Sequence, residues 1–320
     1  MTSRPLPPTG PSPENPGALN WFLVIALGIV WGTAFMSVRL ALEGFGPISV
    51  AAWRCTIGAA VLTACAAALG QGPQQIRAMG GNRGLGFVAG FGVISIALPF
   101  LLLSWGQQHI PSAFAGVAMG AGPLLVLLLV AVFSPEEGIG PRRVAGMVIG
   151  FVGLVVLIGP GALEGPGALE DSALQTWGQL ACLGAAGGYA VGSIMTRRAP
   201  KMPPLAFASG GLIAASLVLL PLALATEGLP SIDLSRSKPL LALLYAALLP
   251  TALASVIRVR VITTAGSLFM SLTSYMVPVW SVIFGIAVMA EDLPQGLYWG
   301  LALILLGIGV SQSRALFRRP

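Results

Sequence analysis

Long apolar runs without a single acidic residue fill most of this 320-residue chain, and they constrain its fold more than any other feature. All 11 acidic residues fall at the chain start or in the short connections between these runs. Such runs suit a lipid bilayer, where a charged side chain is costly. Because Asp and Glu at membrane depth usually mark proton or cation relays, the pattern also predicts a protein that does not depend on a buried carboxylate.

The composition of the chain excludes a soluble fold. Hydrophobic residues make up 56% of the chain and charged residues 9%, whereas a soluble domain carries about 25% charged residues. A net charge of +6 suggests nucleic acid in a soluble protein, but here the basic residues lie scattered between apolar runs. We therefore expect the lipid bilayer as a partner and no nucleic acid. The three cysteines lack the spacing of metal ligands.

Ten runs are long enough to cross a membrane as helices, since a span needs about 20 apolar residues. They lie at about 20–42, 47–69, 84–107, 111–133, 142–161, 175–197, 204–226, 238–259, 264–289 and 294–314. Alternation with a period of two residues is absent, which argues against strands. The predicted fold class is therefore an all-α integral membrane protein with ten transmembrane helices.

Lysine and arginine divide unequally between the two ends of these spans. If the spans alternate in direction, 13 of these residues fall on the side of the N-terminus and 2 on the other side. The remaining two, Arg39 and Arg54, lie inside apolar runs toward that second side. Cytoplasmic loops carry the excess of basic residues, so we expect both termini in the cytoplasm.

The second half of the chain repeats the first at an offset of about 155 residues. Three residues of span four recur in span nine: Ser112, Gly116 and Pro123 correspond to Ser267, Ser271 and Pro278. Because each copy has five spans, the second copy must cross the membrane in the opposite direction. Inverted repeats of this kind build many secondary transporters, with the substrate site near the midplane between the copies.

Two motifs resemble those of a known family. Span one contains Trp31-Gly32-Thr33-Ala34-Phe35, and the last span follows Glu291-Asp292-Leu293-Pro294-Gln295 and runs from Gly300 to Gly307. From Trp21 to Gln312 the chain resembles two copies of the EamA-type drug/metabolite transporters, with a departure at Pro135-Glu136-Glu137-Gly138. The resemblance implies ten helices, residence in the bacterial inner membrane and no cofactor. It also implies transport, often export, of amino acids, related metabolites or drugs.

The repeat and the resemblance together divide the chain into five segments. We expect a disordered cytoplasmic tail at 1–18, a first EamA-like five-helix repeat at 19–161, an outer loop at 162–174, a second EamA-like five-helix repeat at 175–314 and a basic cytoplasmic tail at 315–320.

Four aromatic residues lie within about one helical turn of their span centres, away from the interfaces where anchoring aromatics sit. They are Trp31, Tyr189, Tyr245 and Tyr275. Their rings suit the walls of a substrate pocket, and plain core packing is the alternative. Two hydroxyls lie in the same spans, Ser193 on the face of Tyr189 and Ser271 on a serine stripe of span nine. Such hydroxyls line a wet cavity or, alternatively, let a neighbouring helix approach closely.

Arg54 completes the set of candidate substrate-binding residues. It lies about 10 Å inside the outer end of span two, at about 1.5 Å per residue, with no carboxylate nearby in the sequence. A cation at this depth either anchors the helix or attracts an anionic group of a substrate.

Span five has a face of small residues, Gly146, Gly150 and Gly153. Such a face favours either packing within the chain or a homodimer contact.

These patterns favour a secondary transporter that exports or exchanges small metabolites, above all amino acids or related amphiphiles, by alternating access. A nucleotide-sugar or phosphorylated-metabolite antiporter is an alternative, although such substrates need several basic residues at the cavity and only Arg54 is so placed. A receptor or assembly subunit that moves no substrate is another. We expect no enzyme, because the spans combine neither a nucleophile with a base nor a cluster of metal ligands.

Overall fold

The computed structural model describes residues 16–133, 140–158, 170–229 and 237–317, and within these ranges the secondary structure is helical, without strands. The helices are α1 (Gly17–Ala41), α2 (Pro47–Ala68), α3 (Gln74–Gly92), η1 (Val93–Ala97), α4 (Leu98–Gly106), α5 (Ser112–Met119), α6 (Gly122–Phe133), α7 (Pro141–Ile158), α8 (Glu170–Arg197), α9 (Pro204–Thr226), α10 (Ser237–Ala247), η5 (Leu248–Leu253), α11 (Ala254–Met270), α12 (Thr273–Ala287) and α13 (Gln295–Phe317). The segments η1 and η5 are π-helices. Glu137 and most of the predicted tail at 1–18 and loop at 162–174 lie outside the described residues.

Seven helical segments of the described chain are long and apolar enough to cross a membrane. They are 17–41, 47–68, 74–106, 112–129, 141–158, 204–226 and 237–266, and 273–287 and 295–311 form two shorter apolar helices. The protein is therefore a multi-pass membrane protein. The remaining predicted span, 175–197, lies within α8, which begins earlier than expected, at Glu170. Length and composition do not by themselves establish the predicted count of ten.

Two glycines in the left-handed region divide helices that otherwise run together. Gly81 has φ 57° within α3, and Gly266 has φ 89° within α11. A residue with a side chain is strained at such angles, so glycine permits the sharp change of direction. The Gly266 kink places the end of the predicted eighth span near residue 265, beyond the predicted end at 259.

The two π-helices lie at matching positions in the two halves. The segment η1 begins at Val93 and η5 begins at Leu248, which reproduces the repeat offset of 155 residues. Proline explains the wider turn of η5, because Pro250 has no N–H group with which to continue the α-helical ladder. Such π-bulges occur frequently at functional sites.

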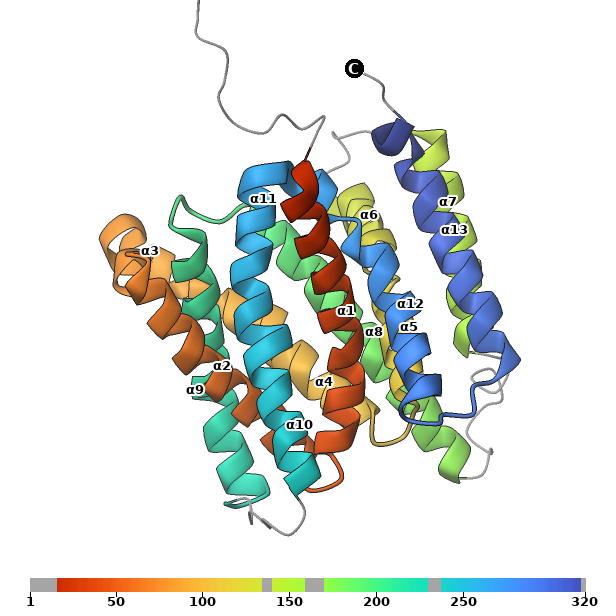
Figure 1. Cartoon of the computed structure of the whole chain (residues 1–320), viewed down its shortest axis with the longest axis horizontal. Helices are drawn as coiled ribbons and strands as arrows, with labels where there is room; N and C mark the ends of the chain where they lie inside the picture. Colours follow the sequence, from red (N-terminus) through yellow and green to blue (C-terminus); the bar gives the residue numbers. More distant parts are fainter. Residues whose placement is uncertain (1–15, 134–139, 159–169, 230–236, 318–320) are drawn as a thin grey trace, which may run out of the picture.

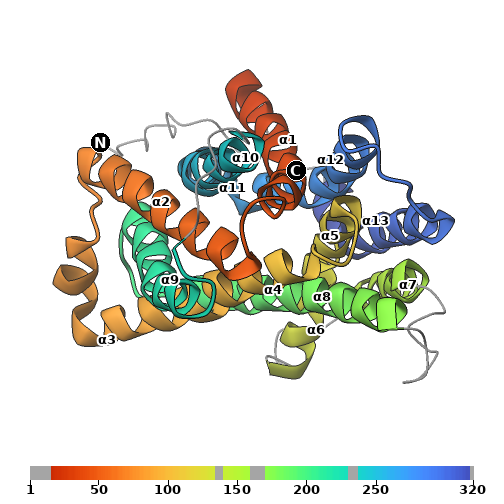
Figure 2. The same ribbon diagram turned by 90° about the horizontal axis from the view of Figure 1, so that it is seen from below.

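Helices of the first half pair with helices of the second half. In the view along the helix axes, α2 and α9 lie at one end of the molecule and α7 and α13 at the other, with α1, α5, α8 and α12 between them (Figures 1 and 2). The α2–α9, α5–α12 and α7–α13 pairs each join one half to the other. Any site between these pairs is therefore built from both halves.

The glycine face of α7 packs inside the chain, against α13. A Cβ atom at Gly307 would lie 2.6 Å from the carbonyl oxygen of Gly146, and one at Gly146 would overlap the carbonyl oxygen of Gly307. Gly153 and Gly300 face each other in the same way, at 3.0 Å in each direction. Small residues let two backbones approach this closely. Of the two sequence-based alternatives for this face, packing within the chain is therefore the one observed.

Candidate functional site

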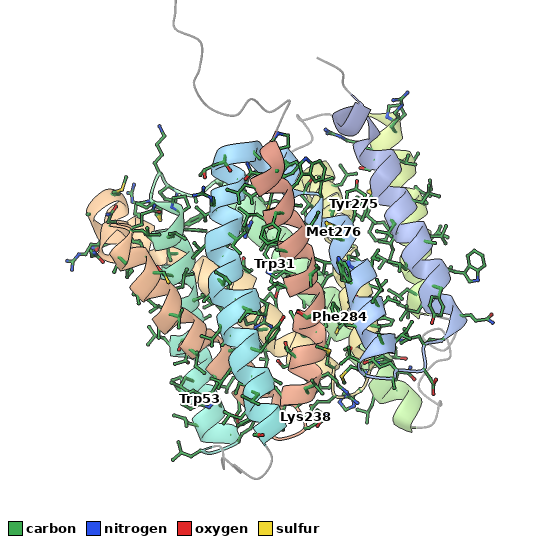
Figure 3. All side chains as sticks on the ribbon, in the orientation of Figure 1. Trp31, Trp53, Lys238, Tyr275, Met276 and Phe284 are labelled. Atoms are coloured by element: carbon green, nitrogen blue, oxygen red, sulfur yellow. The ribbon has the colours of Figure 1, made fainter. Side chains whose placement is uncertain are left out.

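Two of the candidate residues, Trp31 and Arg54, make hydrogen bonds to the π-helix η5. The indole Nε1 of Trp31 on α1 donates a hydrogen bond of 3.1 Å to the carbonyl oxygen of Pro250. The neighbouring hydroxyl of Thr251 donates to the carbonyl of Ala246, five residues earlier, at 2.8 Å. The irregular ladder of η5 thus offers backbone carbonyls to side chains in the middle of the bundle, where Trp31 lies (Figure 3).

Arg54 on α2 is held against the same segment. Its side chain is 7% exposed, and its Nε donates a hydrogen bond of 2.9 Å to the hydroxyl oxygen of Thr251. The ring of Phe100 lies beneath the guanidinium, with 3.9 Å between Cζ and the ring centroid. No residue in the described ranges forms a salt bridge with Arg54. The cation is therefore fixed by a hydroxyl and an aromatic face, and not by a carboxylate.

Tyr189 on α8 joins this group from the other side. Its ring packs against two of the hydrophobic core clusters, one built mainly around α5 and α13 and one built mainly around α2 and α9. Its phenol lies in the neighbourhood of the Arg54 guanidinium. Tyr189 therefore lies at the boundary between these two clusters.

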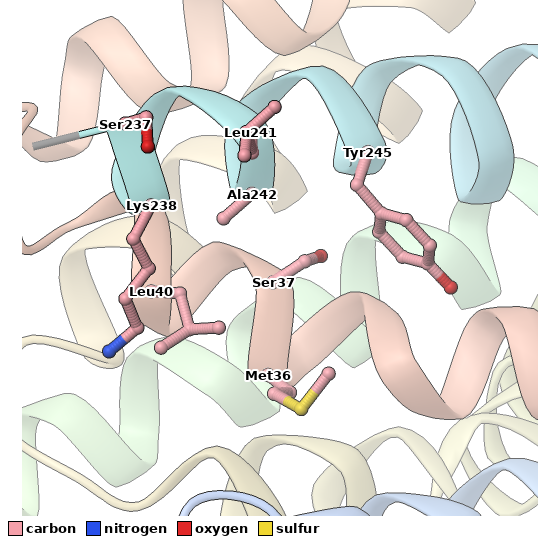
Figure 4. A pocket seen from close by; sticks show the side chains of 8 residues that line it. All are labelled: Met36, Ser37, Leu40, Ser237, Lys238, Leu241, Ala242 and Tyr245. Carbon is pink, nitrogen blue, oxygen red and sulfur yellow. The ribbon is translucent and has the colours of Figure 1, made fainter. Parts of the chain in front are cut away.

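Tyr245 on α10 lines a pocket of about 380 Å³ between α10 and α1. Its hydroxyl lies 2.6 Å from the hydroxyl of Thr33 on α1, a hydrogen bond between the two halves. The wall of the pocket is mostly apolar and consists of Met36, Ser37, Leu40, Ser237, Lys238, Leu241, Ala242 and Tyr245. Lys238 and Tyr245 lie at opposite ends of this row (Figure 4). The Lys238 ammonium pairs with Glu43 at 3.2 Å, so the pocket runs from an ion pair toward a phenol.

The remaining three candidate residues lie in α8 and around the start of α12. Tyr275 lies in the first turn of α12, nearer the end of the molecule where α1 begins than Trp31 does (Figure 3). Its hydroxyl is buried and makes no hydrogen bond with any described residue. Ser271 lies in the turn between α11 and α12. Ser193 is exposed, and its hydroxyl donates at 3.0 Å to the carbonyl of Tyr189 in its own helix.

Three of the seven predicted residues thus join the two halves by hydrogen bonds: Trp31 and Arg54 to η5, and Tyr245 to Thr33 of α1. Tyr189 lies in the neighbourhood of Arg54. Tyr275 shares a core cluster with Trp31, whereas the hydrogen bond of Ser193 stays within α8. Sequence reasoning did not assign Thr33, Thr251 or Phe100 to the site. In the sequence, Thr33 is marked only by its place inside the motif of span one, and Thr251 only by the proline before it.

The described part of the chain holds no group of three or more His, Cys, Asp or Glu side chains able to bind a metal ion. What the arrangement offers is an aromatic and hydroxyl-lined region with one buried cation, which suits binding and orientation of a small molecule.

Comparison with known proteins identifies the family. The model of the EamA-like transporter family matches the chain twice, over residues 19–159 and 176–311. The chain belongs to the EamA-like transporter family. It is accordingly a multi-pass membrane transporter, and the family model matches it in two successive segments.

Relatives of this EamA-like chain include named transporters of bacteria. A probable terminal-alkyne amino-acid exporter of Streptantibioticus cattleyicolor is 27% identical over 93% of this chain and 95% of its own length. The uncharacterized inner membrane transporter YedA of Escherichia coli K12 is 24% identical, over 89% of this chain and 88% of YedA. A solved crystal structure has a TM-score of 0.63 at 22% identity, over 94% of this chain and 99% of that one, and so shares the fold.

Proposed function

We propose that this EamA-like transporter is a secondary carrier that exports small amphiphiles, above all amino acids with short apolar side chains, by alternating access. The observation that carries the proposal is the set of hydrogen bonds around η5. Trp31 and Arg54 of the first half bind Pro250 and Thr251 of the second half. Transporter sites of inverted-repeat proteins lie at such an interface, often beside irregular helix.

The chemistry of this region supports a small amphiphile. Indole and phenol rings bind apolar parts of a molecule while their N–H and O–H groups bind its polar parts. Arg54 supplies one positive charge, and among the described residues no other Lys or Arg side chain is buried to the same extent. A nucleotide sugar or a phosphorylated metabolite carries several negative charges and needs several basic partners. The arrangement therefore favours a substrate with one negative group over those alternatives.

The name of one relative points in the same direction. A terminal-alkyne amino acid has a short apolar side chain on a zwitterionic core, and a probable exporter of such compounds resembles this chain over nearly its whole length. A pocket with mostly apolar walls that ends at the Tyr245 phenol suits such a side chain.

The proposed architecture is a ten-helix inverted repeat, with repeats at 19–161 and 175–314, in the bacterial inner membrane and with both termini in the cytoplasm. Three observations support it. The family model matches twice, the π-helices recur at an offset of 155 residues, and the α7–α13 glycines contact each other reciprocally. The breaks at residues 120–121 and 271–272 interrupt spans four and nine, as discontinuous helices do in many carriers.

The proposal is tested by flux of radiolabelled L-propargylglycine, a terminal-alkyne amino acid, into liposomes that contain the purified protein. We expect uptake above that of protein-free liposomes, and a loss of about ten-fold, equivalent to about 1.4 kcal/mol, when Tyr189 or Tyr245 is replaced by Ala. Phe22→Ala, which truncates an exposed aromatic residue on α1, is the matched control and should leave uptake unchanged. Normal flux in both tyrosine variants would reject the site, and absence of flux for a panel of apolar amino acids would reject the substrate class.

A further inference from the structure

Arg54 is a buried cation, and most of its N–H donors have no acceptor among the described residues. A guanidinium has five N–H donors, and the described residues use one of them, Nε, which donates to Thr251. No described residue accepts a hydrogen bond from Nη1 or Nη2. A charged group in a protein interior is costly unless it is paired and hydrogen-bonded, so a side chain that is 7% exposed with this many free donors calls for a partner.

We infer that Arg54 binds the carboxylate of the transported molecule through Nη1 and Nη2, and that Thr251 and Phe100 are positioning residues for it. The inference deepens the proposed function and rests on it, because it names the group of the substrate that the site recognises.

The orientation of the guanidinium follows from its two neighbours. The Thr251 hydroxyl gives its hydrogen to the carbonyl of Ala246, so its oxygen is left to accept from Arg54 Nε. The Phe100 ring covers one face of the guanidinium plane. With Nε and one face occupied, the Nη edge is the part that remains for a ligand. This edge is planar and matches the two oxygens of a carboxylate.

The surroundings favour a carboxylate of the substrate over one of the protein. The acidic residues of the chain lie in its connections or at its start, away from the apolar runs. Tyr189 adds a phenol, which is neutral at physiological pH. An entering carboxylate would therefore meet a single, prepositioned cation without competition from a resident anion. A lost charge-assisted pair is worth about ten-fold in affinity or more.

The first experiment uses the native protein in liposomes and three compounds that share the same but-3-ynylamine unit. L-propargylglycine carries the carboxylate, L-propargylglycinamide replaces it by a neutral amide, and but-3-ynylamine lacks it. We expect the acid to be transported at least about ten-fold faster than the amide and the amine. Equal transport of the acid and the amide by the native protein would overturn the inference while leaving the proposed transport intact. Absence of flux for all three compounds would count against both the inference and the proposed function.

The second experiment compares variants that separate charge from geometry. Arg54→Lys keeps the positive charge but loses the paired Nη donors and the bond to Thr251. Arg54→Gln loses the charge. We expect uptake of the acid to fall at least about ten-fold in Arg54→Gln, with a smaller fall in Arg54→Lys, while slow uptake of the amide stays unchanged. Arg83→Gln removes an exposed cation of α3 and is the control for net charge.

A purely structural role of Arg54 predicts a different result. If the residue only anchors α2, its variants would lower uptake of the acid and the amide alike, and Thr251→Val would do the same. Carboxylate recognition instead predicts that Thr251→Val raises the KM for the acid alone, because the Thr251 hydroxyl only orients the Arg54 guanidinium. Should Arg54 variants fail to fold, the comparison of acid and amide in Thr251→Val and in the native protein still decides between the two roles.

Discussion

Glu227 and Glu291 make the same contact at corresponding places in the fold. Glu227 accepts hydrogen bonds of 3.0 and 2.8 Å from two first-turn amides of α2, and Glu291 accepts bonds of 2.7 and 3.1 Å from two first-turn amides of α5. In both cases the carboxylate lies 179 and 178 residues along the chain from its donors. The first amides of a helix have no partner within it, and the helix dipole favours a negative charge there. Acidic residues of the second half therefore cap helices of the first.

Removing one of these caps should destabilise the bundle. We expect Glu291→Ala to lower the free energy of unfolding by about 0.5–2 kcal/mol, the usual cost of a lost N-cap. Glu291→Gln, which still offers one acceptor oxygen, should cost less. The measurement is thermal unfolding of the detergent-solubilised protein. Asp292→Asn, which removes the adjacent carboxylate, is the control and should change little. Equal losses in the Asp292 and Glu291 variants would contradict the capping role.

The hydrogen bond between Thr33 and Tyr245 should show itself as coupling between the two halves. Thr33→Val and Tyr245→Phe each remove one hydroxyl and leave a similar shape. Because the two hydroxyls lie 2.6 Å apart, the second replacement should cost little once the first has been made. Initial rates of uptake in a double-mutant cycle measure this coupling. We expect each single variant to lose about the energy of one hydrogen bond, about 0.5–1.5 kcal/mol. Strictly additive losses would show that the bond does not matter for transport.

The orientation of the chain is testable at the connection after α9. Leu229 is 82% exposed, and the positive-inside pattern predicts that this connection lies outside the cytoplasm. A Leu229→Cys variant, made in a chain whose three cysteines are replaced by Ala, should react with a membrane-impermeant maleimide in intact cells. A cysteine at exposed Arg83 should react only after permeabilisation. The opposite pattern would reverse the topology.

The sequence predicts the apolar helices well, because their signal is local. The run at 204–226 coincides with α9, and that at 47–69 differs from α2 by one residue. The predicted boundary between spans eight and nine was wrong, since a kink at one glycine, Gly266, cannot be distinguished by composition from the many glycines inside helices. Hydropathy alone likewise did not reveal the π-helices.

The sequence suffices to propose candidate residues for the site but not to predict their contacts. Depth within a span is enough to single out Trp31, Tyr189 and Tyr245. Their partners are distant in sequence: the bonds of Trp31, Arg54 and Tyr245 join residues 219, 197 and 212 positions apart. A single sequence contains no signal for such pairings, because they depend on which helices of the two halves pack together.

Two glycines of α13, two positions apart, should respond in opposite directions to the same substitution. A Cβ atom at Gly307 would lie 2.6 Å from the Gly146 carbonyl oxygen, so Gly307→Ala must push α7 and α13 apart. Nothing lies within 4 Å of a Cβ atom at Gly309. Gly309→Ala should therefore only gain helix propensity, about 0.5–1 kcal/mol of stability. Overpacking at Gly307 should cost about 1–3 kcal/mol.

Thermal unfolding in detergent measures both effects, with the native protein as the reference. Because Gly146 and Gly307 contact each other reciprocally, Gly146→Ala should lose stability by an amount similar to Gly307→Ala. The combination of both replacements tests whether the two sites share one interface, since neighbouring sites in one contact do not add independently. Stabilisation by Gly307→Ala, or equal destabilisation by Gly309→Ala, would show that α7 and α13 do not pack through this glycine face.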